Sequence, residues 1–362
     1  MERGGATDDI QNIIKYLIKK NIKVSLVSNH IKNTNLKTKH KNFFFSKVSN
    51  KNIFFKFSNR WTTSFYAIKN LIANFSRFKK KNTVVLSMQS SMVSIIICKL
   101  FGVKVIARNQ EDPIYSTIHS ENVFFATIIF ILRFFIYNFA DGILTNSYGS
   151  KKSLEFFIFK KNKIKAIYNP YLLKIKKRNL CKKKNIILSI GRLRKQKDFQ
   201  TLIKGFNEFL RKFPNYKLII LGDGPDKIKI LKLISRLNLE NKVILKGWVN
   251  NTEKYLSYCK VFALTSLYEG LGNVYIDAVN YEVPCVYTKC NSGPNEILLD
   301  DKGGYPIRVG NYNELNQSLV KCISNYAKSK KMILHAKKKI ERFTFNKTCP
   351  DYLRYLEKIS ND

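Results

Sequence analysis

Short apolar runs alternate with longer amphipathic stretches along most of the chain. This alternation is typical of buried parallel strands joined by crossover helices, because helices then cover both faces of the sheet. The runs expected to form strands are residues 22–28, 83–88, 103–107 and 142–146 in the first half and residues 185–190, 217–221, 243–246, 261–265 and 283–287 in the second. Each half is therefore predicted to be a doubly wound, Rossmann-like α/β domain.

The length of 362 residues agrees with two domains, because a single hydrophobic core rarely grows that large. A lysine-rich run without helical or strand periodicity, residues 172–184, is the expected linker. We expect an N-terminal domain over residues 1–171 and a C-terminal domain over residues 185–340. Residues 341–362 are expected to form a helix that packs back on the N-terminal domain.

The start of the chain departs from this pattern. A helix is expected to begin near Thr7 and Asp8 after a turn at Gly4 and Gly5, and no strand precedes that turn. Since a nucleotide-type domain normally begins with a strand, we expect the first strand to be missing and Met1 to be an internal methionine of a longer protein. Residues 1–9 also lack the apolar stretch of a signal peptide, so a cytoplasmic protein is expected.

The composition is strongly basic, with 65 Lys and Arg against 25 Asp and Glu and a net charge of +40. Such a charge attracts nucleic acid, anionic lipid headgroups or phosphorylated substrates. It does not choose among them, and biased codon usage would give the same excess of lysine. The seven cysteines are scattered without a C-x-x-C pair, so neither a disulfide framework nor a zinc site is indicated, and no metal site is expected.

One segment, residues 123–139, is almost entirely apolar. It is about 17 residues long and carries Arg133 at its middle, whereas a membrane span needs about 20 apolar residues with few charges. We expect a buried helix with an apolar outer face. The alternative is that this face rests on a membrane, where the surrounding lysines would meet anionic lipid.

The first stretch that suggests chemistry follows the expected strand at residues 185–190. Gly191 allows a sharp turn, Arg192 offers a planar fork and Lys197 a mobile charge, which together suit two phosphoryl groups. The alternative is a solvated basic loop. After the strand at residues 243–246, Gly247 and Trp248 either line a nucleotide base pocket through main-chain groups or merely end the strand.

The second stretch follows the strand at residues 261–265 and places a carboxylate, Glu269, before two glycines and a helix. The residues between the acid and the helix are Gly270, Leu271, Gly272 and Asn273. A helix N-terminus presents unpaired N–H groups and a positive dipole end, which suit a diphosphate. Asp277, within the helix, is expected to supply a second carboxylate, so that both acids accept hydrogen bonds from sugar or ribose hydroxyls.

These motifs resemble those of retaining glycosyltransferases of the GT-B fold, in family 4 (glycosyl transferases group 1). In that family a Gly-Arg turn and a lysine five residues after the arginine bind the donor diphosphate, and Arg192 and Lys197 match them. The first Glu of the family's E-x7-E motif contacts the donor sugar and the second the ribose. Glu269 matches the first, and Asp277, one methylene shorter, stands in for the second. Residues 292–298 (SGPNEIL) are similar to members that transfer hexoses or N-acetylhexosamines.

The resemblance implies two Rossmann-like domains that face a cleft, with the acceptor on the N-terminal side. It implies a metal-independent transferase without a cofactor, a UDP- or GDP-linked sugar as donor, and a saccharide or polyprenyl-linked acceptor used in cell-surface polysaccharide or lipopolysaccharide synthesis. The basic charge and the apolar segment at residues 123–139 suggest, in addition, a peripheral location at the inner face of the membrane. Gly4 and Gly5 would form the glycine-rich loop that faces the donor phosphates and the acceptor. Arg108 and His119 would face the cleft, and His119 either lies near the donor sugar, as a histidine does in some members, or is incidental. Two alternatives are an inactive, truncated relative that serves as a scaffold and, suggested by charge alone, a nucleic-acid-binding protein, although no nucleic-acid motif is present.

Overall fold

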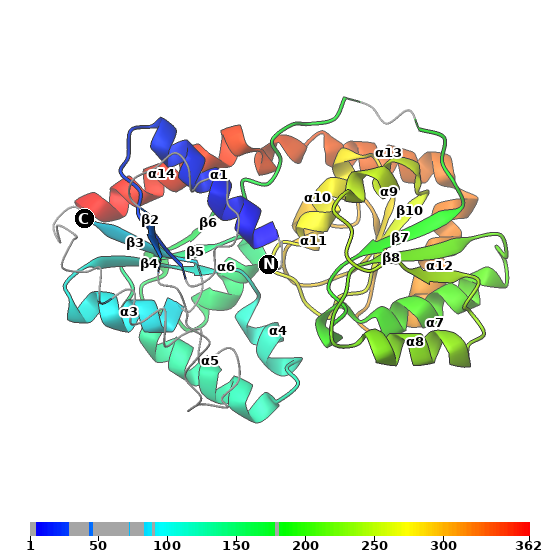
Figure 1. Ribbon diagram of the computed structural model, residues 1–362, viewed down its shortest axis with the longest axis horizontal. Coiled ribbons are helices and arrows are strands. Elements are labelled where there is room, and N and C mark those ends of the chain that lie inside the picture. Colours follow the sequence, from blue (N-terminus) through cyan, green and yellow to red (C-terminus); the bar gives the residue numbers. More distant parts are fainter. Residues whose placement is uncertain (1–4, 29–42, 46–71, 73–82, 89–90, 178–180) are drawn as a thin grey trace.

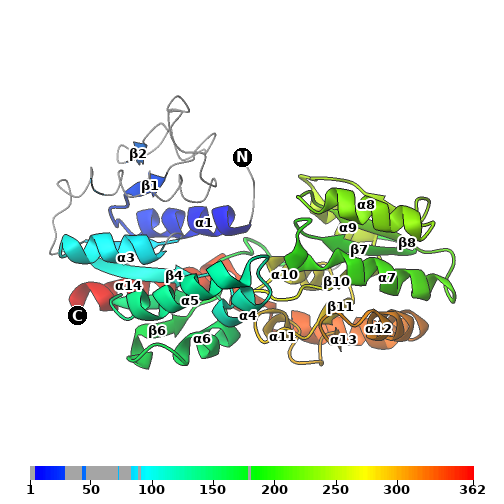
Figure 2. The ribbon, with the colours of Figure 1, turned by 90° about the horizontal axis from the view of Figure 1, so that it is seen from below.

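The computed structural model describes residues 5–28, 43–45, 72, 83–88, 91–177 and 181–362. These residues form two lobes side by side, and each lobe has a parallel sheet with helices packed against it (Figure 1 and Figure 2). The expectation of two Rossmann-like domains is confirmed.

The N-terminal lobe is built on a four-stranded parallel sheet with the strand order β3-β4-β5-β6. Its strands are β3 (Val84–Ser87), β4 (Lys104–Asn109), β5 (Gly142–Thr145) and β6 (Ile164–Ala166). Its helices are α1 (Gly5–Lys19), α3 (Ser91–Leu100), α4 (Pro113–Ile118), α5 (Val123–Tyr137) and α6 (Tyr148–Glu155). Every residue of β5 is buried, as its uninterrupted apolar sequence predicts.

Three expectations for this lobe are wrong. The strand expected at residues 22–28 is only β1 (Leu26–Ser28), and it pairs with β2 (Phe43–Phe45) in a separate two-stranded sheet. Ile22 and Val24 pack against the core without joining a ladder, so their alternation mimicked a strand. Gly5 is the first residue of α1 and not part of a turn, while Gly4 lies outside the described residues.

The third wrong expectation concerns α5, which is a surface helix rather than a buried one. Tyr137 is its only buried residue, and most of its apolar side chains are exposed. No helix in the described part of the chain combines the length and the apolar character that crossing a bilayer requires.

The C-terminal lobe has a six-stranded parallel sheet with the strand order β12-β11-β10-β7-β8-β9. The strands are β7 (Ile186–Ile190), β8 (Lys217–Leu221), β9 (Val243–Leu245), β10 (Val261–Leu264), β11 (Cys285–Thr288) and β12 (Tyr305–Ile307). The helices are α7 (Phe199–Leu210), α8 (Lys227–Arg236), α9 (Thr252–Tyr258), α10 (Asn273–Asn280), α11 (Pro294–Ile297), α12 (Tyr312–Ser324) and α13 (Tyr326–Lys337). The strand order reverses between β7 and β10, which makes their carboxyl ends the switch point of the sheet, where ligands bind in such folds.

The chain passes between the lobes twice, and the two passages lie side by side. The Leu172 amide donates to the Phe343 carbonyl (3.0 Å), and the Phe345 amide donates to the Leu172 carbonyl (2.9 Å). After the second passage, α14 (Phe345–Asn361) lies along the N-terminal lobe and contacts α1 and β3 (Figure 1).

Tyr355 fastens α14 to the N-terminal sheet, because its hydroxyl accepts from the Ile143 amide (3.1 Å) and donates to the Lys163 carbonyl (2.6 Å). We expect Tyr355→Phe to lower the free energy of unfolding of this lobe by about 1–3 kcal/mol, since the buried Ile143 amide and the partly buried Lys163 carbonyl each lose a partner. Denaturant unfolding checks the loss, and hydrogen exchange at the Ile143 amide should accelerate.

Tyr326→Phe is the matched control. Its buried hydroxyl has no hydrogen-bond partner among the described residues, so its removal should leave stability unchanged or raise it. Equal destabilisation by both variants would contradict the role given to Tyr355.

Candidate active site

Two loops meet at the switch point of the C-terminal sheet. One follows β7 and carries residues 191–197, and the other follows β10 and carries residues 265–272. The Leu267 amide donates to the Gln196 carbonyl (2.8 Å), and the Gln196 side chain returns a bond to the Tyr268 carbonyl (3.1 Å). The two stretches singled out in the sequence are therefore tied into one surface.

This pairing of loops joins Lys197 and Glu269 in an ion pair that involves Oε1 of the carboxylate. Ser266 donates to the same oxygen (2.6 Å). Only 15% of the Lys197 side chain and 6% of the Glu269 side chain are exposed, so the pair is largely shielded from water. Attraction between opposite charges strengthens as water is excluded, and the pair holds the Glu269 carboxylate in one orientation.

Gly191 and Arg192 continue this basic surface. A β-carbon at Gly191 would touch the Lys197 side chain at 3.4 Å, and a β-carbon at Gly222 would lie 1.9 Å from the Gly191 carbonyl oxygen. The contact at Gly191 is an ordinary van der Waals one, whereas Gly222 leaves no room for a side chain against the Gly191 carbonyl. Partial burial and the neighbouring Arg194 lower the pKa of Arg192, because both disfavour its positive charge. A bound anion would relieve that repulsion.

Helix α10 begins directly beside Glu269. Gly272, the residue before the helix, has φ of +78°, a conformation that favours glycine, while Leu271 is buried in the core. A β-carbon at Gly272 would lie 3.8 Å from the Glu269 carboxyl carbon. The first N–H groups of α10 have no partner within the helix, so a partially positive end lies next to the Lys197–Glu269 pair.

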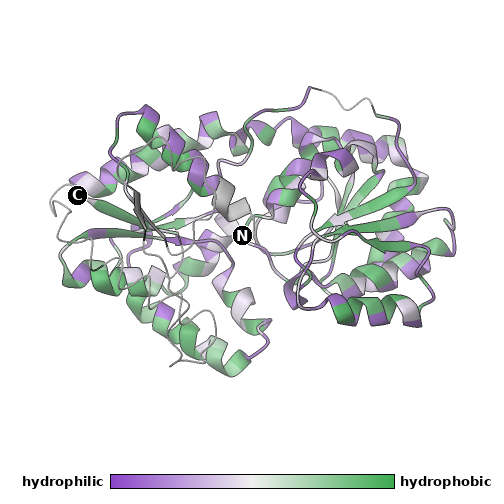
Figure 3. Cartoon of the chain, viewed as in Figure 1, coloured by the Kyte–Doolittle hydropathy of each residue, from purple (hydrophilic) through white to green (hydrophobic). Residues whose placement is uncertain are grey.

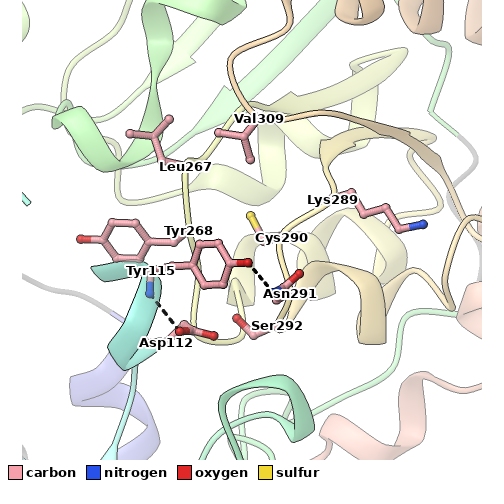
Figure 4. A pocket seen from close by; sticks show the side chains of 9 residues that line it. All are labelled: Asp112, Tyr115, Leu267, Tyr268, Lys289, Cys290, Asn291, Ser292 and Val309. Carbon is pink, nitrogen blue, oxygen red and sulfur yellow. Dashed lines mark hydrogen bonds between the residues drawn. The ribbon is translucent and has the colours of Figure 1, made fainter. Parts of the chain in front are cut away.

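A pocket of about 170 Å³ opens beside these loops, between the two lobes (Figure 4). Its lining comes from both lobes: Asp112, Tyr115, Leu267, Tyr268, Lys289, Cys290, Asn291, Ser292 and Val309. The Asn291 side chain donates to the Tyr115 hydroxyl (2.6 Å) across the gap. Asp112 caps α4 by accepting from the amides of Ile114 (3.0 Å) and Tyr115 (3.1 Å). Burial raises the pKa of Cys290 to about 12, so its thiol stays protonated at neutral pH.

Comparison with known proteins agrees with this geometry. The family model described as "Glycosyl transferases group 1" matches residues 173–339. A Campylobacter jejuni N-acetylgalactosamine-N,N'-diacetylbacillosaminyl-diphospho-undecaprenol 4-alpha-N-acetylgalactosaminyltransferase is 33% identical over 266 residues, which cover 72% of this chain and 72% of that protein. This chain belongs to the group 1 glycosyltransferase family.

Two further similarities define the extent of the match. An uncharacterized glycosyltransferase of Methanocaldococcus jannaschii is 35% identical over 277 residues, which cover 70% of this chain and 66% of that protein, just under two thirds of its length. The crystal structure of Anabaena HepE in complex with UDP and glucose has a TM-score of 0.75 and 19% sequence identity, covering 98% of this chain and 96% of that one. The fold of this glycosyltransferase is therefore GT-B.

Asp277 lies one turn into α10, in contact with the passage between the lobes. The Tyr171 hydroxyl donates to its Oδ2 atom (2.6 Å). Burial raises the pKa of Asp277 to about 7, and the hydrogen bond from Tyr171 opposes this shift without cancelling it. At the start of α10, Asn273 accepts a hydrogen bond from the Asn169 side chain (3.0 Å). Both residues are thus held by the segment that connects the lobes. The contact of Asp277 with a ribose, and donor binding by Asn273, stay predictions.

The expectation that Arg108 faces the cleft is wrong. Its guanidinium is fully buried, donates to the Asn169 side chain (2.6 Å) and lies 3.9 Å from the Asp9 carboxylate. The reason is that α1 and α14 cover this face of the sheet, and the side chain of Tyr352 in α14 lies under the guanidinium. Arg108 is linked to α10 indirectly, through the Asn169 side chain, which donates to Asn273.

His119, in contrast, lies at the cleft. Its ring stacks on that of Tyr268 from the other lobe, with centroids 6.2 Å apart, and on Tyr115 within α4. Burial and the charge of Lys195 lower the pKa of His119, which favours the neutral imidazole. Gly247 accepts from the Gly222 amide (2.7 Å) at the edge of the sheet, and Trp248 is 56% exposed there. The roles predicted for these residues stay predictions.

The sequence analysis missed the residue that clasps the lobes together. The Glu296 carboxylate accepts from the amides of Tyr148 (3.0 Å) and Gly149 (2.8 Å) at the start of α6, and from the Tyr168 hydroxyl (2.9 Å). Its motif, residues 292–298, was recognised, but a contact across about 150 residues has no local signal in the sequence. Tyr115 and Asn291, which bond across the pocket, were missed for the same reason.

Gly149 makes this closed arrangement possible, because a β-carbon there would lie 2.1 Å from the Asn291 carbonyl oxygen. We expect Gly149→Ala to push the lobes apart without unfolding either one, since alanine is favoured over glycine within a helix such as α6 by about 1 kcal/mol. Small-angle scattering should show a larger radius of gyration than for the wild type, with Lys152→Ala on the same helix as the control. A scattering curve for Gly149→Ala that matches the wild type would contradict the closed contact.

Proposed function

We propose that this protein is a retaining glycosyltransferase that needs no metal ion and moves a hexose or N-acetylhexosamine from a UDP- or GDP-linked sugar to a saccharide or lipid-linked acceptor in cell-surface polysaccharide synthesis. The observation that carries the proposal is the buried Lys197–Glu269 pair at the switch point, between the basic turn at Arg192 and the first turn of α10.

Charge develops on the leaving diphosphate as the bond to the anomeric carbon breaks. Arg192, Lys197 and the N–H groups that begin α10 surround the place where those oxygens would lie, so positive groups meet the negative charge without rearrangement. In metal-dependent transferases a divalent cation does this. Here the protein's own cations are proposed to do it.

Glu269 is proposed to hold the donor sugar. Lys197 and Ser266 both donate hydrogen bonds to Oε1, which fixes the plane of the carboxylate. The remaining oxygen can then accept a hydrogen bond from a sugar hydroxyl. In a front-face displacement the acceptor oxygen bonds to the anomeric carbon on the side from which the diphosphate leaves, and the acceptor proton passes to a phosphate oxygen. No protein nucleophile is required for this sequence of bonds.

The names of relatives support the choice of substrates. The C. jejuni relative is named for the transfer of N-acetylgalactosamine to a diphospho-undecaprenol-linked saccharide, and HepE was solved with UDP and glucose. A UDP-linked donor and a lipid-linked acceptor are therefore the first pair to test.

Arg192→Ala and Lys197→Ala should each weaken donor binding by about tenfold to a hundredfold, because each removes charge-assisted bonds of about 1.5–3 kcal/mol to the phosphates. Calorimetric titration with UDP and with UDP-sugars measures the change. Lys229→Ala, an exposed lysine on α8 paired with Asp226, is the control and should bind normally. Unchanged affinity and turnover in both site variants would refute their role.

Glu269→Ala should abolish sugar transfer while UDP binding is retained, since the carboxylate is assigned to the sugar and not to the phosphates. Turnover with a radiolabelled donor and titration with UDP alone separate the two effects. If sugar transfer and UDP binding were lost to the same degree, Glu269 would instead be assigned to nucleotide binding. Hydrolysis of donor by the wild type would exclude the inactive-scaffold alternative.

A further inference from the structure

Helix α5 presents an unusually apolar surface to solvent. Phe124, Phe125 and Phe135 are 72%, 62% and 58% exposed. The other apolar residues of the helix that are exposed are Val123, Ile128, Ile129, Ile131 and Leu132. Figure 3 shows this helix as an almost continuous hydrophobic band along the lower edge of the N-terminal lobe. Contiguous exposed apolar surface of this kind marks an interaction site in soluble proteins.

The surface extends beyond α5 onto the loop that follows α6. Phe156 and Phe159 are 83% and 76% exposed, and the ring of Phe159 packs against Phe134 of α5 with centroids 5.6 Å apart. Asn138, just after α5, donates to the Phe157 carbonyl (3.1 Å) and accepts from the Phe159 amide (2.8 Å). We call the exposed apolar residues of α5, together with Phe156 and Phe159, the apolar face.

Around the apolar face, positive charges outnumber the negative ones, which include the exposed Glu121 just before α5. Lys160 and Lys161 follow Phe159 and are exposed, and Arg133 is the only charged residue on α5 itself. The nearby acidic residues Asp141 and Glu155 are each paired with a lysine, at Lys99 and Lys151. Helices that lie on membranes combine Phe and Leu on one side with Lys and Arg around it, and each lysine near an anionic bilayer adds about 1 kcal/mol. A second copy of this chain would instead bring the same positive charges together.

The apolar face also begins beside the active site. Residues 119–122 alone connect α4 to α5, and Asn122 caps α5 by accepting from the Phe125 amide (3.2 Å). On α4, Tyr115 lines the pocket, and from the other lobe Lys195 donates to the Ser120 carbonyl (3.2 Å). Any partner or membrane that binds to α5 would therefore lie next to the pocket.

We propose that the apolar face docks on an anionic lipid bilayer and so brings the pocket between the lobes to the membrane surface, where a lipid-linked acceptor presents its sugar. The helix is about 22 Å long, so it can lie in the interface without crossing the bilayer. The acceptor half of this proposal rests on the proposed function, whereas docking does not.

The experiment is sedimentation of the full chain with vesicles of phosphatidylcholine containing phosphatidylglycerol. The triple variant Phe125→Ser, Leu132→Ser, Phe135→Ser should bind at least tenfold more weakly than the wild type. The matched control, Ile228→Ser with Leu231→Ser, removes exposed apolar residues from α8 in the other lobe and should bind normally. Pure phosphatidylcholine vesicles should bind the wild type more weakly than anionic ones.

Equal binding by the triple variant and the wild type would overturn docking, as would absence of wild-type binding. Conversion of a wild-type dimer to a monomer by the triple variant, seen by light scattering without vesicles, would assign the apolar face to a second copy and would also overturn it. UDP titration of the triple variant should match the wild type. Failure of the wild type to bind UDP would count against the proposed function and leave the docking result standing.

Discussion

The two lobes touch backbone to backbone, and the active site depends on this contact. A β-carbon at Gly270 would lie 1.8 Å from the Gln110 carbonyl oxygen, and Gly149 is similarly close to the opposite lobe. With glycine at both places, the rings of His119 and Tyr268 can stack, and Asn291 can reach the hydroxyl of Tyr115. The Lys197–Glu269 pair lies directly next to this contact and is itself largely shielded from water, which strengthens the charge interactions around it.

Burying the Lys197–Glu269 ion pair costs free energy, and the groups around it offset this cost. Taking a lysine and a glutamate out of water is unfavourable, and their mutual attraction offsets the penalty only when both are well oriented. Ser266 adds a bond to the carboxylate, and the first turn of α10 adds positive potential. A diphosphate arriving at this place finds a lysine already held in position, so little side-chain freedom is lost when it binds.

Local features of the sequence predicted most of the fold, but they could not predict contacts between segments that are far apart in the sequence. The strands of the C-terminal sheet could be found because each is a short apolar run ended by a turn, and the loops at Arg192 and Glu269 follow two of them. The strands β6 and β12 were missed because neither is a continuous apolar run: Lys165 interrupts one and Pro306 the other, whereas β9, equally short, is entirely apolar. The burial of Arg108, the bond from Tyr171 to Asp277 and the clasp at Glu296 join residues about 60 to 150 positions apart. The apolar run at residues 123–139 correctly predicted helix α5 but not its exposure, because composition does not show how many faces of a helix other elements cover.

The two adjacent chain segments that connect the lobes, at Leu172 and Phe345, limit how the lobes can move relative to each other. Because these two connecting segments are hydrogen-bonded to each other, the lobes can rotate about them as a hinge more readily than they can move apart. Tyr171 and Asn169 lie at the first passage and bond to Asp277 and Asn273 on α10, so the helix that begins beside Glu269 is tied to the axis of that rotation. The clasp at Glu296 and the stacked rings at His119 hold the lobes together elsewhere in the cleft. Opening the cleft therefore breaks the contacts of the N-terminal lobe with Tyr268, Asn291 and Glu296, while the bonds to α10 near the axis and the mutual bonds of the donor-side loops are kept.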